Sequence, residues 1–140
     1  MTHPDWAGYR RFRPLFAEAM DPAFYPIDHL DALLLSGRAR LFVGEEAAIV
    51  AEIRAYPGGA RAVHGLVAAG RIEEIVDALI PRAEAWGRAR GCTHAVVESR
   101  AGWMRALRLH GYEPHQVALR KDLSPLWPIS TFRAGTSSTR

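Results

Sequence analysis

The chain has a single cysteine, Cys92, so it has no internal disulfide. Its longest apolar runs, such as the Ala-Leu-Leu-Leu of residues 32–35, are far shorter than the roughly 20 residues that a membrane-spanning helix needs. No secretory signal is recognisable at the N terminus. Together these absences predict a reducing, cytoplasmic location and no membrane partner.

Lysine is nearly missing, because Lys121 is the only one and arginine supplies the rest of the 18 basic residues. Against 15 acidic residues the formal charge is +3, and the one dense basic cluster is Arg10-Arg11-Arg13. Proteins that bind nucleic acid usually carry a longer basic stripe, so the composition argues against such a partner. The six histidines lack the spacing of a metal site, and neither a P-loop nor a dinucleotide-binding fingerprint occurs.

What remains is an ordinary globular composition, with 49% hydrophobic and 24% charged residues in a chain of 140. A domain of this size buries enough surface to fold without a disulfide or a metal. We expect one domain over residues 1–123 and a Pro/Ser/Thr-rich tail over residues 124–140. Two large apolar residues in the tail, Trp127 and Phe132, are candidates for binding a partner protein or a second copy.

Hydrophobic periodicity and turn residues predict the order of the elements. We expect helices at 5–20, 28–37, 72–90 and 101–110, and strands at 40–43, 47–56, 61–67, 93–98 and 115–123. The clearest helix is 72–90, whose apolar residues recur every three or four positions; Pro81 predicts a kink in it. The run Ala95-Val96-Val97 predicts a strand that is buried on both faces. Strand–helix–strand order favours a partly parallel sheet covered by helices.

Residues 64–123 resemble the second half of the GNAT acetyltransferase fold. The resemblance rests on a long helix that ends in Trp86 and Gly91-Cys92, followed by a strand and by a short helix that ends in Gly111-Tyr112. The run 98–112 is also similar to small GNAT-like proteins of phage and prophage genomes. The resemblance implies an α/β (α+β) fold with a mixed central sheet, helices on both faces and an irregular C-terminal tail.

The resemblance also implies acetyl-CoA as the cofactor. In this family the pantetheine arm lies along a strand edge where two parallel strands splay apart, and the pyrophosphate binds amides of a Gly-rich turn at a helix start. These contacts fall here on Leu66, Val67, Ala69, Gly70, Arg71 and Arg100. Only Gly70 remains of the glycine pattern. Arg71 either compensates as a phosphate ligand or is a solvated charge, and Arg100 either contacts CoA or an acidic partner, or pairs with Glu98.

The family's general acid, a tyrosine, aligns with Leu107, which cannot donate a proton. Trp103, Leu107 and His110 share one helical face and are expected in the core. The candidate general bases are Glu52 and His64, and each has a structural alternative, as a solvent-facing carboxylate or a core histidine.

Two functions follow. One is acyl-CoA-dependent N-acyl transfer with a degenerate site, whose activity is reduced or lost. The other is a non-catalytic GNAT-like scaffold that binds another protein in a phage- or prophage-derived particle through the C-terminal tail.

Overall fold

The computed structural model describes residues 5–98, 103–116 and 118–124. In chain order its elements are α1 (Trp6–Ala19), α2 (Ile27–Leu35), β1 (Ala39–Val43), β2 (Ala47–Ala55), β3 (Arg61–Gly70), α3 (Ile72–Glu74), the π-helical turn η1 (Ile75–Leu79), α4 (Ile80–Ala89), β4 (His94–Val97) and α5 (Met104–Arg108). This order agrees with the sequence prediction up to α5.

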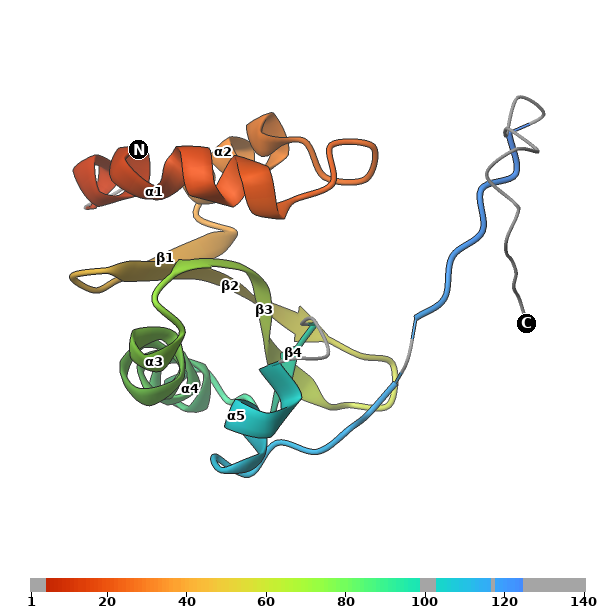
Figure 1. The fold of residues 1–140 in the computed structure, drawn as a ribbon. Helices are drawn as coiled ribbons and strands as arrows, with labels where there is room; N and C mark the ends of the chain where they lie inside the picture. Colours follow the sequence, from red (N-terminus) through yellow and green to blue (C-terminus); the bar gives the residue numbers. More distant parts are fainter. Residues whose placement is uncertain (1–4, 99–102, 117, 125–140) are drawn as a thin grey trace.

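The strands form one mixed sheet in the order β1-β2-β3-β4. β1, β2 and β3 are antiparallel neighbours, and β3 and β4 are parallel. Figure 1 shows α1 and α2 on one face of the sheet and α3, α4 and α5 on the other. The expected mixed sheet with helices on both faces is therefore confirmed.

Each face of the sheet has its own hydrophobic core, because successive strand residues point to opposite faces. Ala48 and Val50 of β2 face the α1/α2 layer, whereas Ile49 and Ala51 face the α3–α5 layer. The core between the sheet and the α1/α2 layer, called the upper core below, also contains Tyr9, Phe12 and Phe16 of α1 and Leu30, Leu33 and Leu34 of α2. The core between the sheet and the α3–α5 layer, called the lower core below, also contains Ile75, Val76, Leu79, Ile80, Ala83 and Leu107.

The long helix expected at 72–90 contains a π-helical turn, Ile75–Leu79, just before Pro81. The Ile80 amide donates to the carbonyl of Ile75, five residues back, instead of four. Pro81 follows at the start of α4. Proline has no N–H and its ring crowds the preceding turn, so a wider turn at this point accommodates it without ending the helix. After α4, Gly91 at φ +82° supports the predicted helix stop.

The strand expected at 115–123 is wrong for the described part of that segment. Residues 113–116 and 118–124 have no strand structure and are exposed. Leu119 is 92% exposed and Leu123 is 83% exposed, and Arg120 pairs instead with Asp21 at 2.9 Å. In the part of the chain that the structure describes, no helix has both the length and the hydropathy of a membrane span.

Candidate functional site

A cleft of about 510 Å³ opens where β3 and β4 part. Parallel pairing of the two strands ends at Gly65 and Val97, but β3 continues to Gly70. From Leu66 onward, the side of β3 that faced β4 has no partner in β4. Backbone N–H and C=O groups on such an edge are available to a ligand.

A β-bulge lies at the same point of β3. Val50 of β2 is opposite Val67, but the next residue, Ala51, is opposite Gly65, so Leu66 is an extra residue. A bulge bends its strand and re-aims the side chains around it. The bend of β3 therefore coincides with the last residue pair that it shares with β4. An isolated glycine inside a strand pattern, here Gly65, was the sequence signal for this bulge.

Most side chains that line the cleft are apolar, and backbone groups and Glu98 add polar surface. Its lining residues are Ala19, Ile49, Gly65, Leu66, Val67, Ala68, Ala69, Gly70, Ile75, Ile80, Val97, Glu98 and Trp103. Four of the six expected cofactor contacts, Leu66, Val67, Ala69 and Gly70, are thus brought together. Trp103, expected in the core, packs on the lower core and also lines the cleft. Among the described lining residues, Glu98 is the one with a titratable side chain, and that side chain is 74% exposed.

The two candidate bases, Glu52 and His64, lie directly opposite each other on β2 and β3. Arg54 joins them: its Nε donates to Glu52 Oε2 at 2.7 Å, and its Nη1 lies 3.2 Å from His64 Nε2. Glu98 Oε1 lies 3.8 Å from the same nitrogen. Glu98 therefore belongs both to this polar cluster and to the cleft.

His64 is only 2% exposed, and burial is the main reason that its pKa lies below the usual value; the charge of Arg54 lowers that pKa further. The imidazole is therefore neutral at pH 7. Arginine can only donate, so Nε2 is the acceptor of the Arg54 bond and the proton is on Nδ1. Nδ1 is buried and has no hydrogen-bond partner among the described residues. Arg54 thus engages the basic lone pair of His64, and it also engages the carboxylate of Glu52.

The carboxylate that stays open toward the cleft is Glu98. Sequence reasoning considered this residue only as a partner of Arg100, and it missed Arg54. A signal for Arg54 was present, because residues two apart on a strand share a face and Glu52 was already a candidate.

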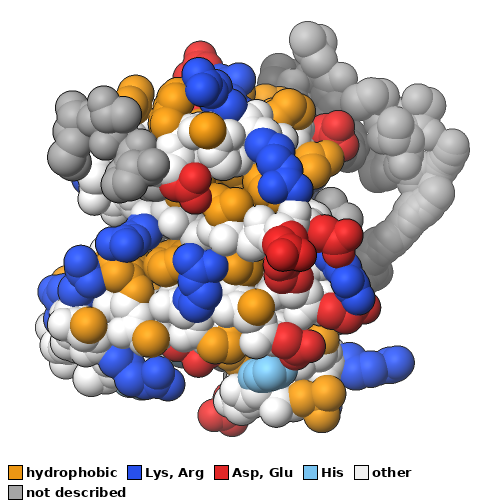
Figure 2. Space-filling model, turned by 90° about the vertical axis from the view of Figure 1, so that its left-hand side faces the viewer, with side chains coloured by type: hydrophobic (Ala, Val, Ile, Leu, Met, Phe, Trp, Pro, Cys, Tyr) orange, Lys and Arg blue, Asp and Glu red, His pale blue; other side chains and the backbone are white. Residues whose placement is uncertain are grey.

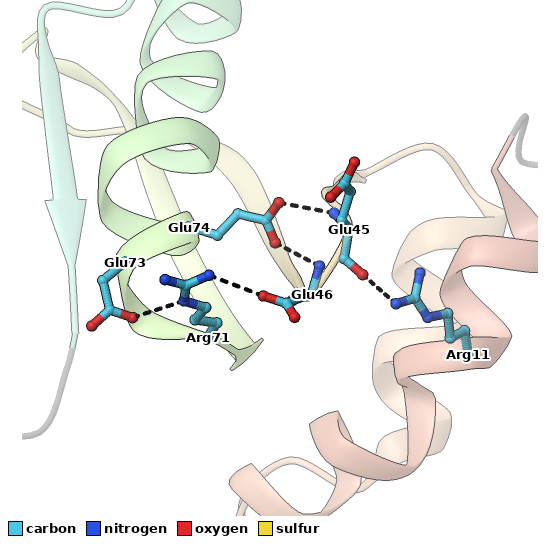
Figure 3. A network of polar contacts seen from close by, with 6 residues as sticks. All are labelled: Arg11, Glu45, Glu46, Arg71, Glu73 and Glu74. Carbon is cyan, nitrogen blue, oxygen red and sulfur yellow. Dashed lines mark hydrogen bonds and ion pairs between the residues drawn. The ribbon is translucent and has the colours of Figure 1, made fainter.

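A network of polar contacts occupies the start of the α3–α4 helix, where the resemblance places the pyrophosphate (Figure 3). β3 runs on to Gly70, so Arg71 alone separates strand from helix. Arg71 Nη1 is 3.1 Å from Glu46 Oε1, and its Nε is 3.2 Å from Glu73 Oε1. The guanidinium is therefore already paired with two carboxylates.

Glu74 takes up backbone amides in the same network. Its carboxylate accepts from the N–H groups of Glu45 and Glu46 at 2.8 and 2.7 Å, and these bonds lower the pKa of Glu74. Arg11 of α1 donates to the carbonyl of Glu45 from the other side. Figure 2 looks onto this side of the molecule and shows acidic side chains gathered beside basic ones between the two layers.

The two ends of the expected cofactor therefore meet different surroundings. The mostly apolar cleft, and the edge of β3 that none of the described strands pairs with beyond Gly65, fit an acyl-pantetheine arm. The start of the helix does not fit a diphosphate well, because the carboxylates of Glu46, Glu73 and Glu74 lie there and Arg71 is paired. Repulsion between like charges opposes an anion at such a site.

The position of the family's general acid is apolar and closed. Leu107 is 5% exposed in the lower core. The nearby tyrosine, Tyr112, donates its hydroxyl to Glu84 Oε2 of α4 at 2.6 Å, and burial raises its pKa. It does not line the cleft. His110, expected in the core, is exposed and its Nε2 lies 3.1 Å from Asp77 Oδ1. Arg100, Trp127 and Phe132 lie outside the described residues.

Neither a protein-family model nor a curated protein matches the sequence. Solved structures do match the fold. A GCN5-related N-acetyltransferase from Ralstonia eutropha has a TM-score of 0.63 at 20% identity, over 85% of this chain and 92% of its own. The glucosamine-6-phosphate N-acetyltransferase from Arabidopsis thaliana has a TM-score of 0.63 at 10% identity, over 89% and 95%.

A third match is a predicted acetyltransferase from Clostridium acetobutylicum, solved with acetyl-CoA. Its TM-score is 0.58 at 10% identity, over 74% of this chain and 77% of that one. The matches cover both halves of the chain, including the N-terminal half, where the sequence resemblance rested on the order of the elements. The chain therefore has the fold of the GNAT N-acetyltransferases.

Proposed function

We propose that the chain binds an acyl-CoA thioester by its acyl-pantetheine end and transfers the acyl group slowly to an amine. The observation that supports this most is the cleft at Leu66–Gly70, because it combines a mostly apolar wall with an unpaired strand edge at the point where two parallel strands separate. A fold neighbour solved with acetyl-CoA gives the chemistry of the ligand.

The chain's own residues have three tasks in this reaction. The β3 edge from Leu66 onward binds the amide-rich arm as an added strand would be bound. The mostly apolar wall excludes water from the thioester, which supplies the activated acyl group. Transfer forms a C–N bond, breaks a C–S bond and releases one amine proton, which Glu98 takes up as general base. The neutral His64 and the cationic Arg54 give Glu98 polar surroundings. Neither of them takes up that proton, because the basic nitrogen of His64 is bonded to Arg54 and Arg54 is already protonated.

The leaving thiolate has no positioned acid among the described lining residues. Its proton then comes from water. A positioned general acid or base typically contributes about 10²–10⁴-fold to a rate, so we expect turnover to be slower by about that factor than with an acid in place.

Thermal unfolding with acetyl-CoA and with acetyl-pantetheine tests binding. A ligand that binds only the folded state stabilises it by about 2.7 kcal/mol at 100 times its dissociation constant. We expect both thioesters to raise the melting temperature. No shift with either at millimolar concentration would sink the proposal.

Glu98→Gln tests the chemistry. We expect this variant to keep the thioester-induced shift and to lose acyl transfer to a primary amine. Glu113→Gln, at another exposed glutamate, is the matched control and keeps both.

A second candidate is a non-catalytic scaffold that binds another protein. The core position of Leu107 and the paired state of Arg71 favour it. The phage or prophage particle in this alternative rests on the resemblance of residues 98–112 alone. Deletion of residues 124–140 should then abolish assembly and leave the domain folded, and the protein should bind neither thioester.

A further inference from the structure

One edge of the sheet is formed by β1, which pairs with β2 on its inner side and with none of the described strands on its outer side. The Gly44 amide donates to the carbonyl of Ala47 at 2.8 Å, and hydrogen-bonded and non-hydrogen-bonded pairs alternate along an antiparallel ladder. Arg40 and Phe42 are therefore the residues that bond to β2, and the N–H and C=O groups of Leu41 point outward. Outward backbone groups of this kind can bind a further strand.

Three exposed arginines gather on two aromatic rings beside this edge. Phe42 of β1 and Trp86 of α4 meet edge to face, with their ring centroids 5.7 Å apart. The guanidinium carbons of Arg40 and Arg82 lie 5.9 and 5.8 Å from the Phe42 centroid. The guanidinium carbon of Arg90 lies 5.0 Å from the Trp86 centroid. We call these three arginines on their two rings the arginine face. A ring beneath a guanidinium restrains it and leaves its N–H donors available to an anion.

The arginine face has no acidic partner within the described chain. All 15 aspartates and glutamates lie in the described residues, and none of them forms an ion pair with Arg40, Arg82 or Arg90. The segments outside the described residues contain arginine but no acidic side chain. A partner that neutralises this face with acidic side chains is therefore another molecule.

The shape of the edge selects an extended peptide. A nucleic acid offers phosphates but no peptide groups to pair with Leu41, whereas an added strand offers both an N–H and a C=O. Alternate side chains of a strand share a face, so acidic residues at every second position all point to the arginine face. The one opposite Arg40 comes within about 5 Å of it, measured between Cβ atoms. Beyond β1, the exposed Glu45 and Glu46 repel a longer polyanion.

We propose that an acidic, extended segment of another protein adds to the outer edge of β1 and places its carboxylates on the arginine face. Arg82 now donates to the carbonyl of Val43 at 3.1 Å. An N–H of the incoming strand replaces it there and frees its guanidinium for a carboxylate. β2 and β3 separate this edge from β4, and the arginine face shares no residue with the cleft. The interaction therefore does not depend on the proposed acyl transfer.

Fluorescence anisotropy of a labelled peptide of about seven residues, alternating valine and glutamate, tests the proposal on the full chain. We expect this peptide to bind, and its counterpart with glutamine in place of glutamate to bind at least about ten-fold more weakly. Arg40→Gln/Arg82→Gln/Arg90→Gln should weaken binding about ten-fold, because one exposed ion pair is worth up to about five-fold in affinity. Arg40→Gln alone should weaken it about two- to five-fold, which keeps the test decisive if the triple variant loses its circular dichroism signal.

The matched control removes the same charge from elsewhere on the surface. Arg10→Gln/Arg105→Gln/Arg108→Gln also replaces three exposed arginines, and it should leave the affinity for the acidic peptide nearly unchanged. Hydrogen exchange of single amides separates strand addition from charge attraction alone. The peptide should slow exchange of the outward Leu41 amide and should not alter that of Phe42, which already bonds to β2.

Four results would overturn the proposal. The acidic peptide does not bind at millimolar concentration; or the arginine-face variants bind it as tightly as the control does; or the Leu41 amide exchanges equally fast with and without it. The fourth is a labelled single-stranded oligonucleotide that binds more tightly than the peptide and loses as much affinity in the triple variant, which would make the face a nucleic-acid surface. None of these measurements involves a thioester, so the proposed acyl transfer keeps its own tests.

Discussion

Gly70 lies directly against the backbone of Glu46, so that a Cβ on Gly70 would overlap the carbonyl oxygen of Glu46 and the Cα of Ala47. The next residue, Arg71, donates its amide to that same carbonyl at 3.0 Å. Gly70 has a φ of +102°, which side chains strongly disfavour. The glycine that the sequence associates with phosphate binding is therefore required by the packing of the β1–β2 turn against the helix start.

We predict that Gly70→Ala destabilises the protein. The backbone strain alone costs about 1–3 kcal/mol, and the overlap with Glu46 adds to it. Denaturant unfolding measures the loss. Gly58→Ala is the matched control, because a Cβ there meets nothing within 4 Å, and it should leave stability nearly unchanged. A Gly70→Ala variant as stable as the control would contradict this packing.

Releasing Arg71 should strengthen CoA binding. The double variant Glu46→Gln/Glu73→Gln removes both ion-pair partners of Arg71 and leaves Glu74 as the remaining carboxylate at the helix start. These pairs are exposed, so each is worth at most about 1 kcal/mol, and we expect affinity for acetyl-CoA to rise about two- to five-fold by calorimetry. Affinity for acetyl-pantetheine, which has no phosphate, should not change. An equal gain for both ligands would show that Arg71 does not act on phosphate.

Acid should destabilise the protein through His64. Its pKa in the folded state is below 6.5, the value of the unfolded chain, so the unfolded state binds more protons as the pH falls below about 6.5. The free energy of unfolding should therefore be highest above that pH and decrease below it, until the folded-state pKa is reached. In His64→Leu this contribution should disappear. The control His115→Gln, at an exposed histidine, should keep the wild-type pH profile; identical profiles for all three proteins would be evidence against a buried, neutral His64.

Tyr112 should contribute to stability and not to catalysis. Tyr112→Phe removes a bond to a carboxylate whose side chain is only 23% exposed, and such charge-assisted bonds are worth about 1.5–3 kcal/mol. We expect that loss in denaturant unfolding, with the rate of acyl transfer per folded molecule unchanged. Tyr25→Phe, at a half-exposed tyrosine, is the control. A selective loss of rate in Tyr112→Phe would make Tyr112 the missing acid.

Much of the fold was predictable because its signals are local. Apolar spacing located the long helix, Gly91 its end, and the run Ala95-Val96-Val97 the next strand. The parallel pairing of β3 and β4 then followed from the strand–helix–strand order. The cross-strand contact of Glu52 with His64 was also within reach, because counting outward from the 57–60 turn makes them partners.

The unpredicted parts depend on residues far apart in sequence. The bulge at Leu66 depends on how the residues of β3 pair with those of β2. The network around Arg71 joins glutamates at 45 and 46 to glutamates at 73 and 74, and only the folded chain places the β1–β2 turn at that helix start. The segment at 115–123 has the composition of a strand, but a strand also needs a neighbour, which no sequence pattern supplies.

The π-helical turn at Ile75–Leu79 holds one residue more than an α-helical turn, so the residues on its two sides keep the faces that they would have in a continuous α-helix. A helix advances about 100° per residue, so removing one residue from α4 between Ile80 and Ala83 would rotate everything after it by that angle. Ala83 would leave the lower core, and Trp86 would leave its edge-on contact with Phe42. A single-residue deletion should thus be tolerated far better inside the π-helical turn than in α4, which makes this turn the one place in the helix where length can change without moving the core.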